Sequence, residues 1–168
     1  EADDGWHVGA WDLADPSAPR RAGDVLVPGE VTAMSLDGSR LAVVGYAPPA
    51  VPDTPSEPQL TLVDVGTPLA PRLVRTVRFG AAEGDAYELP LVAVAGRHAF
   101  VATVVGIGAS ARYRLYAIDL DAAGGAVGSL AIAGPISGLT AAAGFVFVAP
   151  ACPALQEPCA VTAIDALP

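Results

Sequence analysis

The architecture of this chain follows from the stretch Leu60-Thr61-Leu62-Val63-Asp64-Val65, in which a short apolar run leads to an aspartate. Similar stretches, with apolar or small residues before and after an aspartate, return at residues 8–13, 114–120 and 160–166. The aspartates Asp12, Asp64, Asp119 and Asp165 lie 52, 55 and 46 residues apart. This spacing is close to the roughly 40–50 residues of a four-stranded propeller blade. It therefore predicts an all-β unit that is repeated along the chain.

Each repeat contains the same predicted parts in the same order. A first apolar strand (31–36, 91–95, 138–143) is followed by a tight turn that contains glycine and by a second apolar strand (41–45, 99–105, 145–149). A loop of variable length then leads to the strand that ends in Asp. A fourth strand completes the unit at residues 73–79 and 127–132. We therefore expect repeated four-stranded antiparallel blades.

The turns after the first two aspartates are also alike, since Asp15-Pro16-Ser17-Ala18-Pro19-Arg20 matches Thr67-Pro68-Leu69-Ala70-Pro71-Arg72. Proline fixes φ and donates no hydrogen bond, so the paired prolines end a strand and set a rigid turn. Together with the strands that end in Asp, these turns resemble the LVIVD-type repeat of bacterial surface β-propellers. The resemblance implies a radial, extracellular β-propeller with an interaction or scaffold role, and no catalytic residues.

The repeats are not all complete. When each predicted strand is assigned its place in a blade, from first to fourth, the repeats contribute two, four, four and three strands. The segment is therefore expected to begin and end with the third strand of a blade. We expect one β-propeller segment over residues 1–168, a partial propeller of three to four blades. Its blade parts are expected at about 1–28, 29–80, 89–133 and 136–168, with further blades or a partner covering the open faces. Evenly spaced strands with Gly and Pro turns are also typical of a β-sandwich, but the constant four-part order favours the propeller.

The chain is acidic, with a formal net charge of −9, and it contains arginine but no lysine. An acidic surface repels phosphate, which argues against nucleic acid and anionic membranes as partners. No apolar run approaches the roughly 18 residues of a transmembrane helix. Cys152 and Cys159 bracket the loop between the second and third strands of the last unit. We expect a disulfide there, and hence an extracellular or periplasmic protein. Two free buried thiols are the alternative.

In an up-and-down blade, the loops between the second and third strands share one face with the links between blades. Here these are the long connections, whereas the connections on the opposite face are tight turns. Long ordered loops on a rigid scaffold commonly carry binding residues. The binding-face candidates are their acidic, aromatic and basic residues, namely Tyr46, Asp53, Glu57, Glu83, Asp85, Tyr87, Glu88, Arg112 and Tyr113. A Ca²⁺ site at Glu83-Gly84-Asp85 is one alternative to solvated loop charge, and no other cofactor is expected.

The repeated aspartates invite a catalytic interpretation, but a catalytic group is needed only once. We predict instead that each accepts hydrogen bonds from turn amides after its strand. Trp11 stands just before Asp12, where other copies have Val63 and Ile118, and is therefore expected in the core. His98 falls in a turn and is expected to be exposed.

The sequence favours a non-enzymatic scaffold that contacts protein or glycan through its long-loop face. One alternative is a propeller hydrolase or lactonase-like enzyme with its site at the central channel. The innermost strands (31–34, 91–94, 138–141) contain no carboxylate or histidine, and Glu30 is the nearest exception. A purely structural repeat within a larger assembly is a third possibility.

Overall fold

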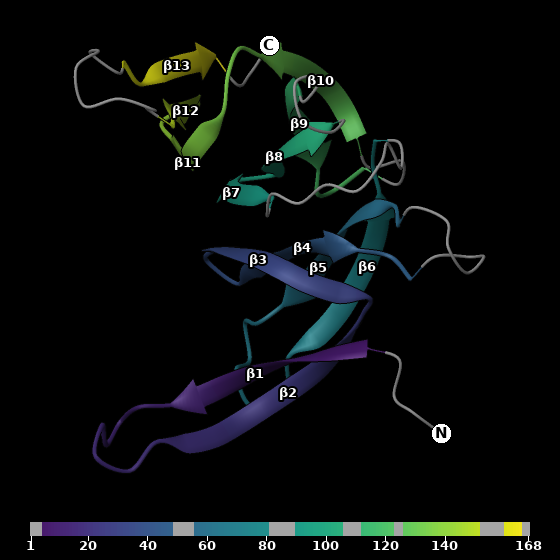
Figure 1. Ribbon diagram of the computed structural model, residues 1–168. Coiled ribbons are helices and arrows are strands. Elements are labelled where there is room, and N and C mark those ends of the chain that lie inside the picture. Colours follow the sequence, from purple (N-terminus) through teal and green to yellow (C-terminus); the bar gives the residue numbers. More distant parts are fainter. Residues whose placement is uncertain are drawn as a thin grey trace.

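The computed structural model describes residues 5–48, 56–80, 90–105, 112–122, 126–151 and 160–165. Within these ranges the chain forms β-strands and turns and no helix (Figure 1). None of the described residues therefore belongs to a helix that could cross a membrane.

The strands form four antiparallel sheets in which neighbours in sequence are also neighbours in space. The first sheet contains β1 (Gly5–Asp12) and β2 (Arg20–Pro28). The second contains β3 (Glu30–Asp37), β4 (Arg40–Tyr46), β5 (Pro58–Asp64) and β6 (Arg72–Arg78). The third contains β7 (Leu91–Ala95), β8 (His98–Val105), β9 (Arg112–Asp119) and β10 (Ala126–Ile132). The fourth contains β11 (Ile136–Ala142), β12 (Phe145–Pro150) and β13 (Thr162–Asp165). The predicted all-β class and the strand numbers of two, four, four and three are confirmed for the described residues.

Three hydrophobic cores separate the sheets, because side chains alternate between the two faces of each strand. The core between the second and third sheets contains Ala42, Val44, Leu60, Leu62, Val77, Phe79, Val92, Val94, Ala99, Val101, Tyr116, Ile118 and Leu120. The core between the first and second sheets includes Val27, Val43 and Val63, and the core between the third and fourth includes Phe100, Ala102, Leu115, Val146 and Val148. The two inner sheets are thus apolar on both faces.

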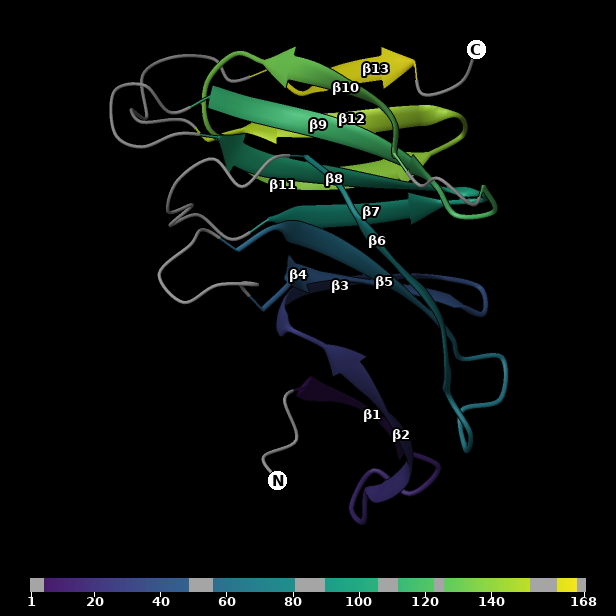
Figure 2. The ribbon, with the colours of Figure 1, turned by 90° about the vertical axis from the view of Figure 1, so that its right-hand side faces the viewer.

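The sheets are stacked in the order of the chain, so the two faces of each sheet have different neighbours. In β9, Tyr116 and Ile118 face the second sheet, whereas Leu115 and Ala117 face the fourth. Each sheet therefore has a preceding face, turned toward the sheet before it in the chain, and a following face, turned toward the next. The first strands of successive sheets meet, since β3 contacts β7 and β7 contacts β11. Figure 2 shows β1 and β2 at one end of the molecule, the second sheet next to them, and the third and fourth sheets, which overlap in this view, at the other end.

The prediction that Trp11 is a core residue is wrong, because its side chain is 60% exposed. Val63 and Ile118, at the same place in the repeat, are fully buried on the preceding faces of their sheets. Trp11 lies on the preceding face of the first sheet, and no described sheet covers that face. His98 also differs from expectation, since it is only partly exposed and its ring lies 6.2 Å from that of Phe100.

Candidate binding surface

The strand register gives the stack two different ends. In the second sheet, Tyr46 pairs with Pro58 at one end, and Arg40 pairs with Asp64 at the other. The long connections 47–57, 79–90 and 106–111 all leave the sheets at the first of these ends, which we name the long-loop end. The tight turns and the strands that end in Asp lie at the opposite end, the turn end. Two of the longest connections, 47–57 and 79–90, thus lie at the long-loop end, whereas the connections after Asp12 and Asp64 at the turn end span residues 13–19 and 65–71.

The turn end is organised by the repeated aspartates. Asp12 Oδ1 accepts a hydrogen bond from the Ala14 amide at 2.9 Å, and Asp64 Oδ1 accepts one from the Gly66 amide at the same distance. Asp119 Oδ1 accepts two, from Asp121 at 2.8 Å and Ala122 at 3.1 Å. The predicted structural role is therefore confirmed for the first three aspartates. Each carboxylate stabilises the turn that follows its strand.

Arginine partners stabilise two of these carboxylates further. The Gly66 amide and then Arg72, whose Nη2 lies 2.9 Å from Oδ2, hold the pKa of Asp64 below its usual value. Arg97 forms an ion pair with Asp119 and, together with the turn amides, lowers the pKa of Asp119 to about 2. Both carboxylates therefore remain ionised at neutral pH. A general acid would need a raised pKa.

Polar contacts at the turn end also tie the second sheet to the third. Arg75 donates hydrogen bonds to the backbone oxygens of Asp119, at 2.6 Å, and of Ala122. Arg40 forms an ion pair with Asp121 at 3.0 Å. A cavity of about 450 Å³ lies among these groups. Because its charged side chains already have partners within the chain, we assign them a structural role.

The long-loop end presents four of the predicted binding-face residues in the described part of the chain. Tyr46 is half-buried, and burial followed by the nearby charge of Glu30 raises the pKa of its phenol. Glu57 is exposed and lies 3.0 Å from Arg78, while its backbone oxygen accepts a hydrogen bond from the Ala47 amide at 2.8 Å. Arg112 is exposed and Tyr113 is partly exposed at the start of β9. The base of the 47–57 connection is therefore fixed by backbone and side-chain contacts.

The remaining predicted site residues, Asp53, Glu83, Asp85, Tyr87 and Glu88, lie outside the described residues, as do both cysteines. The proposed Ca²⁺ site and the predicted disulfide fall there too. Among the described residues, no group of three or more His, Cys, Asp or Glu side chains could hold a metal ion.

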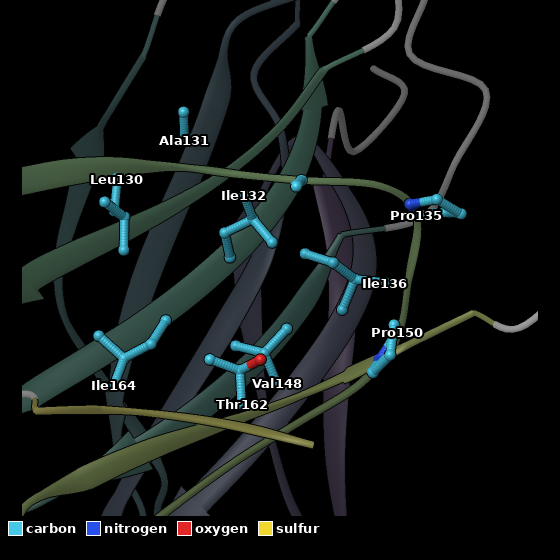
Figure 3. Close-up of a pocket in the computed structure, with 10 residues that line it drawn as sticks. Leu130, Ala131, Ile132, Pro135, Ile136, Val148, Pro150, Thr162 and Ile164 are labelled. Atoms are coloured by element: carbon cyan, nitrogen blue, oxygen red, sulfur yellow. The ribbon is translucent and has the colours of Figure 1, made fainter. Parts of the chain in front are cut away.

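One surface feature was not predicted from the sequence. A cavity of about 300 Å³ lies between β10 and the fourth sheet, and Figure 3 shows Ile132, Ile136, Val148 and Ile164 around it. Its lining is mostly apolar. This cavity opens beside β13, which is the edge strand of the fourth sheet among the described residues.

Comparison with known proteins gave no match: no family model matches the chain, and no curated protein or solved structure matches it.

Proposed function

We propose that this chain is a segment of a β-propeller with LVIVD-type repeats, which acts as a non-enzymatic extracellular or periplasmic scaffold. In this proposal, a protein or glycan partner binds at the long-loop end. The observation that carries the proposal is the separation of the two ends of the stack. Two of the longest connections, 47–57 and 79–90, leave one end and contain aromatic and charged residues, and the turns stabilised by aspartates occupy the other.

The radial arrangement is supported by the way equivalent strands meet. The first strands β3, β7 and β11 lie next to one another, and the fourth strands β2 and β6 are also in contact. In a propeller the first strands surround the axis and the fourth strands form the rim. The outer faces of the stack expose Trp11 on the first sheet and Phe145 on the last, where further blades would pack.

A scaffold role is favoured over the hydrolase by the strands that would surround the axis. Among β3, β7 and β11, carboxylates occur only at the two ends of β3, at Glu30 and Asp37. Asp37 accepts a hydrogen bond from the Gly96 amide at 2.7 Å and so stabilises the turn end. The described inner strands thus offer Glu30 alone as a candidate acid at the long-loop end.

The experiment places a photo-crosslinking amino acid, p-benzoylphenylalanine, at one of two exposed positions. Arg112 lies at the long-loop end, and Leu69, whose side chain is 72% exposed, lies at the turn end. Both proteins are screened on a glycan array and irradiated in an envelope extract of the source cells. We expect the substitution at Arg112, but not the one at Leu69, to weaken glycan binding or to crosslink one protein partner.

Equal crosslinking from both positions, or crosslinking from Leu69 alone, would contradict the assignment of the long-loop end. Hydrolysis of ester, lactone or glycoside substrates by the unmodified protein would instead support the enzyme alternative.

A further inference from the structure

The cavity between β10 and the fourth sheet lies at a position that aromatic rings fill one junction earlier, where a junction is the contact between two successive sheets. The strands that end in Asp119 and Asp165 have the same place in their sheets, so the residues three positions before these aspartates are equivalent. They are Tyr116, which is buried, and Thr162, which lines the cavity. The third sheet thus has a phenol ring where the fourth sheet has a small hydroxyl side chain.

The strand on the other side of each junction shows the same kind of change. Arg75 of β6 and Gly128 of β10 each pair with the residue two positions before the aspartate of the neighbouring strand, so Phe79 and Ile132 are equivalent as well. Phe79 is buried, and the centre of its ring lies 5.2 Å from that of Tyr116. Ile132 is only partly buried. Isoleucine and threonine therefore stand beside the cavity in place of a packed pair of rings.

The fourth strand of the later sheet does not fill this space in the other junctions. Among the described side chains, β10 contributes none to the core between the second and third sheets, and β6 contributes none to the core between the first and second. In both cores the later sheet contributes side chains from its first three strands. The cavity therefore follows from the smaller side chains on its walls.

The chemistry of the lining limits what the cavity can hold. Figure 3 shows the apolar side chains of Ile132, Ile136, Val148 and Ile164 around it. Among the described residues of the lining, Thr162 carries the one polar side chain. A volume of about 300 Å³ is within the range of small-molecule sites, and an apolar cavity of roughly 150 Å³ can already hold benzene. Burial of a charge without a partner is costly. The lining thus suits an uncharged ring.

We propose that this cavity binds a free, uncharged aromatic molecule of a single ring. The molecule takes the place that the rings of Phe79 and Tyr116 have one junction earlier. A hydroxyl group on the ring lies beside Thr162. The inference goes beyond the proposed scaffold function and does not depend on it, because it rests on the strand register and on the cavity.

The two prolines of the lining favour a free molecule over an aromatic side chain of a partner protein. Pro135 and Pro150 have no backbone N–H to donate. The oxygen of Pro135 already accepts a hydrogen bond from the Ala151 amide at 2.8 Å. The oxygen of Pro150 accepts one from the Ser137 hydroxyl at 3.0 Å. These backbone groups are therefore poorly suited to pair with the backbone of a partner, which a side chain would bring with it.

The test follows the isoleucine δ1 methyl groups of the isotope-labelled 168-residue chain by NMR, with p-cresol as the probe. The chain has five isoleucines, of which Ile132, Ile136 and Ile164 line the cavity. Ile118, the repeat equivalent of Ile164, is fully buried in the core that contains Tyr116 and is the internal control. We expect p-cresol to shift the three lining methyl signals with one dissociation constant, of about 1 mM or tighter, and to leave the Ile118 signal unchanged.

Variants that restore a ring should remove the space for the ligand. Thr162→Tyr should weaken p-cresol binding roughly 10-fold or more and raise the Tm of the free protein, because the new ring fills the cavity. Ile132→Phe fills the space from β10 and replaces Thr162→Tyr if that variant does not fold. Leu69→Tyr adds the same ring at an exposed position of the turn end and should bind p-cresol as the unsubstituted protein does.

Two related probes test the class of ligand. p-Toluate has a similar ring with a negative charge, and N-acetyltyrosinamide has the p-cresol ring on a peptide unit. We expect both to bind at least roughly 10-fold more weakly than p-cresol. Equal binding of p-toluate would overturn the proposal, and equal binding of N-acetyltyrosinamide would do so by making a partner's side chain the occupant.

Three other results would also overturn the proposal. They are unshifted lining methyl signals, a shift of Ile118 as large as theirs, and unchanged p-cresol binding in a folded filling variant. None of these results would bear on a protein or glycan partner at the long-loop end, which the crosslinking at Arg112 tests independently.

Discussion

Leu60→Ala should destabilise the protein by about 3 kcal/mol, because Leu60 lies at the centre of the core between the second and third sheets. Its side chain is completely buried on β5, among residues of both sheets. The substitution removes three carbons, and at about 0.8 kcal/mol for each buried CH₂ the lost transfer energy is roughly 2.4 kcal/mol. The cavity left behind adds to this loss, within the roughly 2–5 kcal/mol typical of buried Leu→Ala changes.

The assay is guanidinium denaturation together with a thermal scan. A loss of about 3 kcal/mol corresponds to a fall in Tm of roughly 6–12 °C for a protein of this length. Leu69→Ala removes the same atoms from an exposed turn position and should change the free energy of unfolding by less than about 0.5 kcal/mol. If Leu60→Ala costs less than about 1 kcal/mol with an unchanged m-value, the second and third sheets are not packed as described.

Three other measurements test separate features of the structure. Gly29→Ala should lower the free energy of unfolding, measured by denaturation, far more than Gly38→Ala. Both glycines have positive φ, at 72° and 57°. A Cβ at Gly29 would collide with the Tyr46 carbonyl oxygen, whereas one at Gly38 meets open space. Asp119 has a pKa of about 2 in the folded protein against 3.8 for an unperturbed group. It therefore stabilises the fold above pH 4 and loses this contribution as the pH falls toward 2. Asp119→Asn should thus reduce the fall in the free energy of unfolding between pH 4 and 2, and an unchanged fall would contradict the lowered pKa. The phenol of Tyr46 should ionise above its usual pKa of 10 in an ultraviolet titration, and Glu30→Gln should lower that value part of the way, since burial is the larger cause.

The sequence predicted the sheets well because the signals for them are local. The alternation in residues 60–64 sends Leu60 and Leu62 to the following face and Thr61 and Val63 to the preceding face, and both faces of an inner sheet are buried. An aspartate after such a strand can accept hydrogen bonds from amides two residues ahead, as Asp64 does. Neither feature depends on distant parts of the chain.

What the sequence did not predict depends on contacts between sheets. Trp11 has the same local pattern as Val63, but none of the described sheets packs against it, so its burial could not be inferred from its position in the repeat. Arg75 crosses to the backbone oxygens of Asp119 and Ala122, 44 and 47 residues away. A repeat pattern describes each unit and not the polar contacts that join two units.

The order of the sheets in the stack explains which two of its faces are exposed. Because the residue before each repeated Asp always faces the preceding sheet, every unit presents the same pair of surfaces, one to the unit before it and one to the unit after it. Such a contact joins unlike surfaces, and contacts of this kind continue until rotation closes a ring or the assembly extends without limit. Trp11 on the first preceding face and Phe145 on the last following face are the two unmatched members of that series. Within the described residues, both side chains are exposed because no further sheet packs against these two faces.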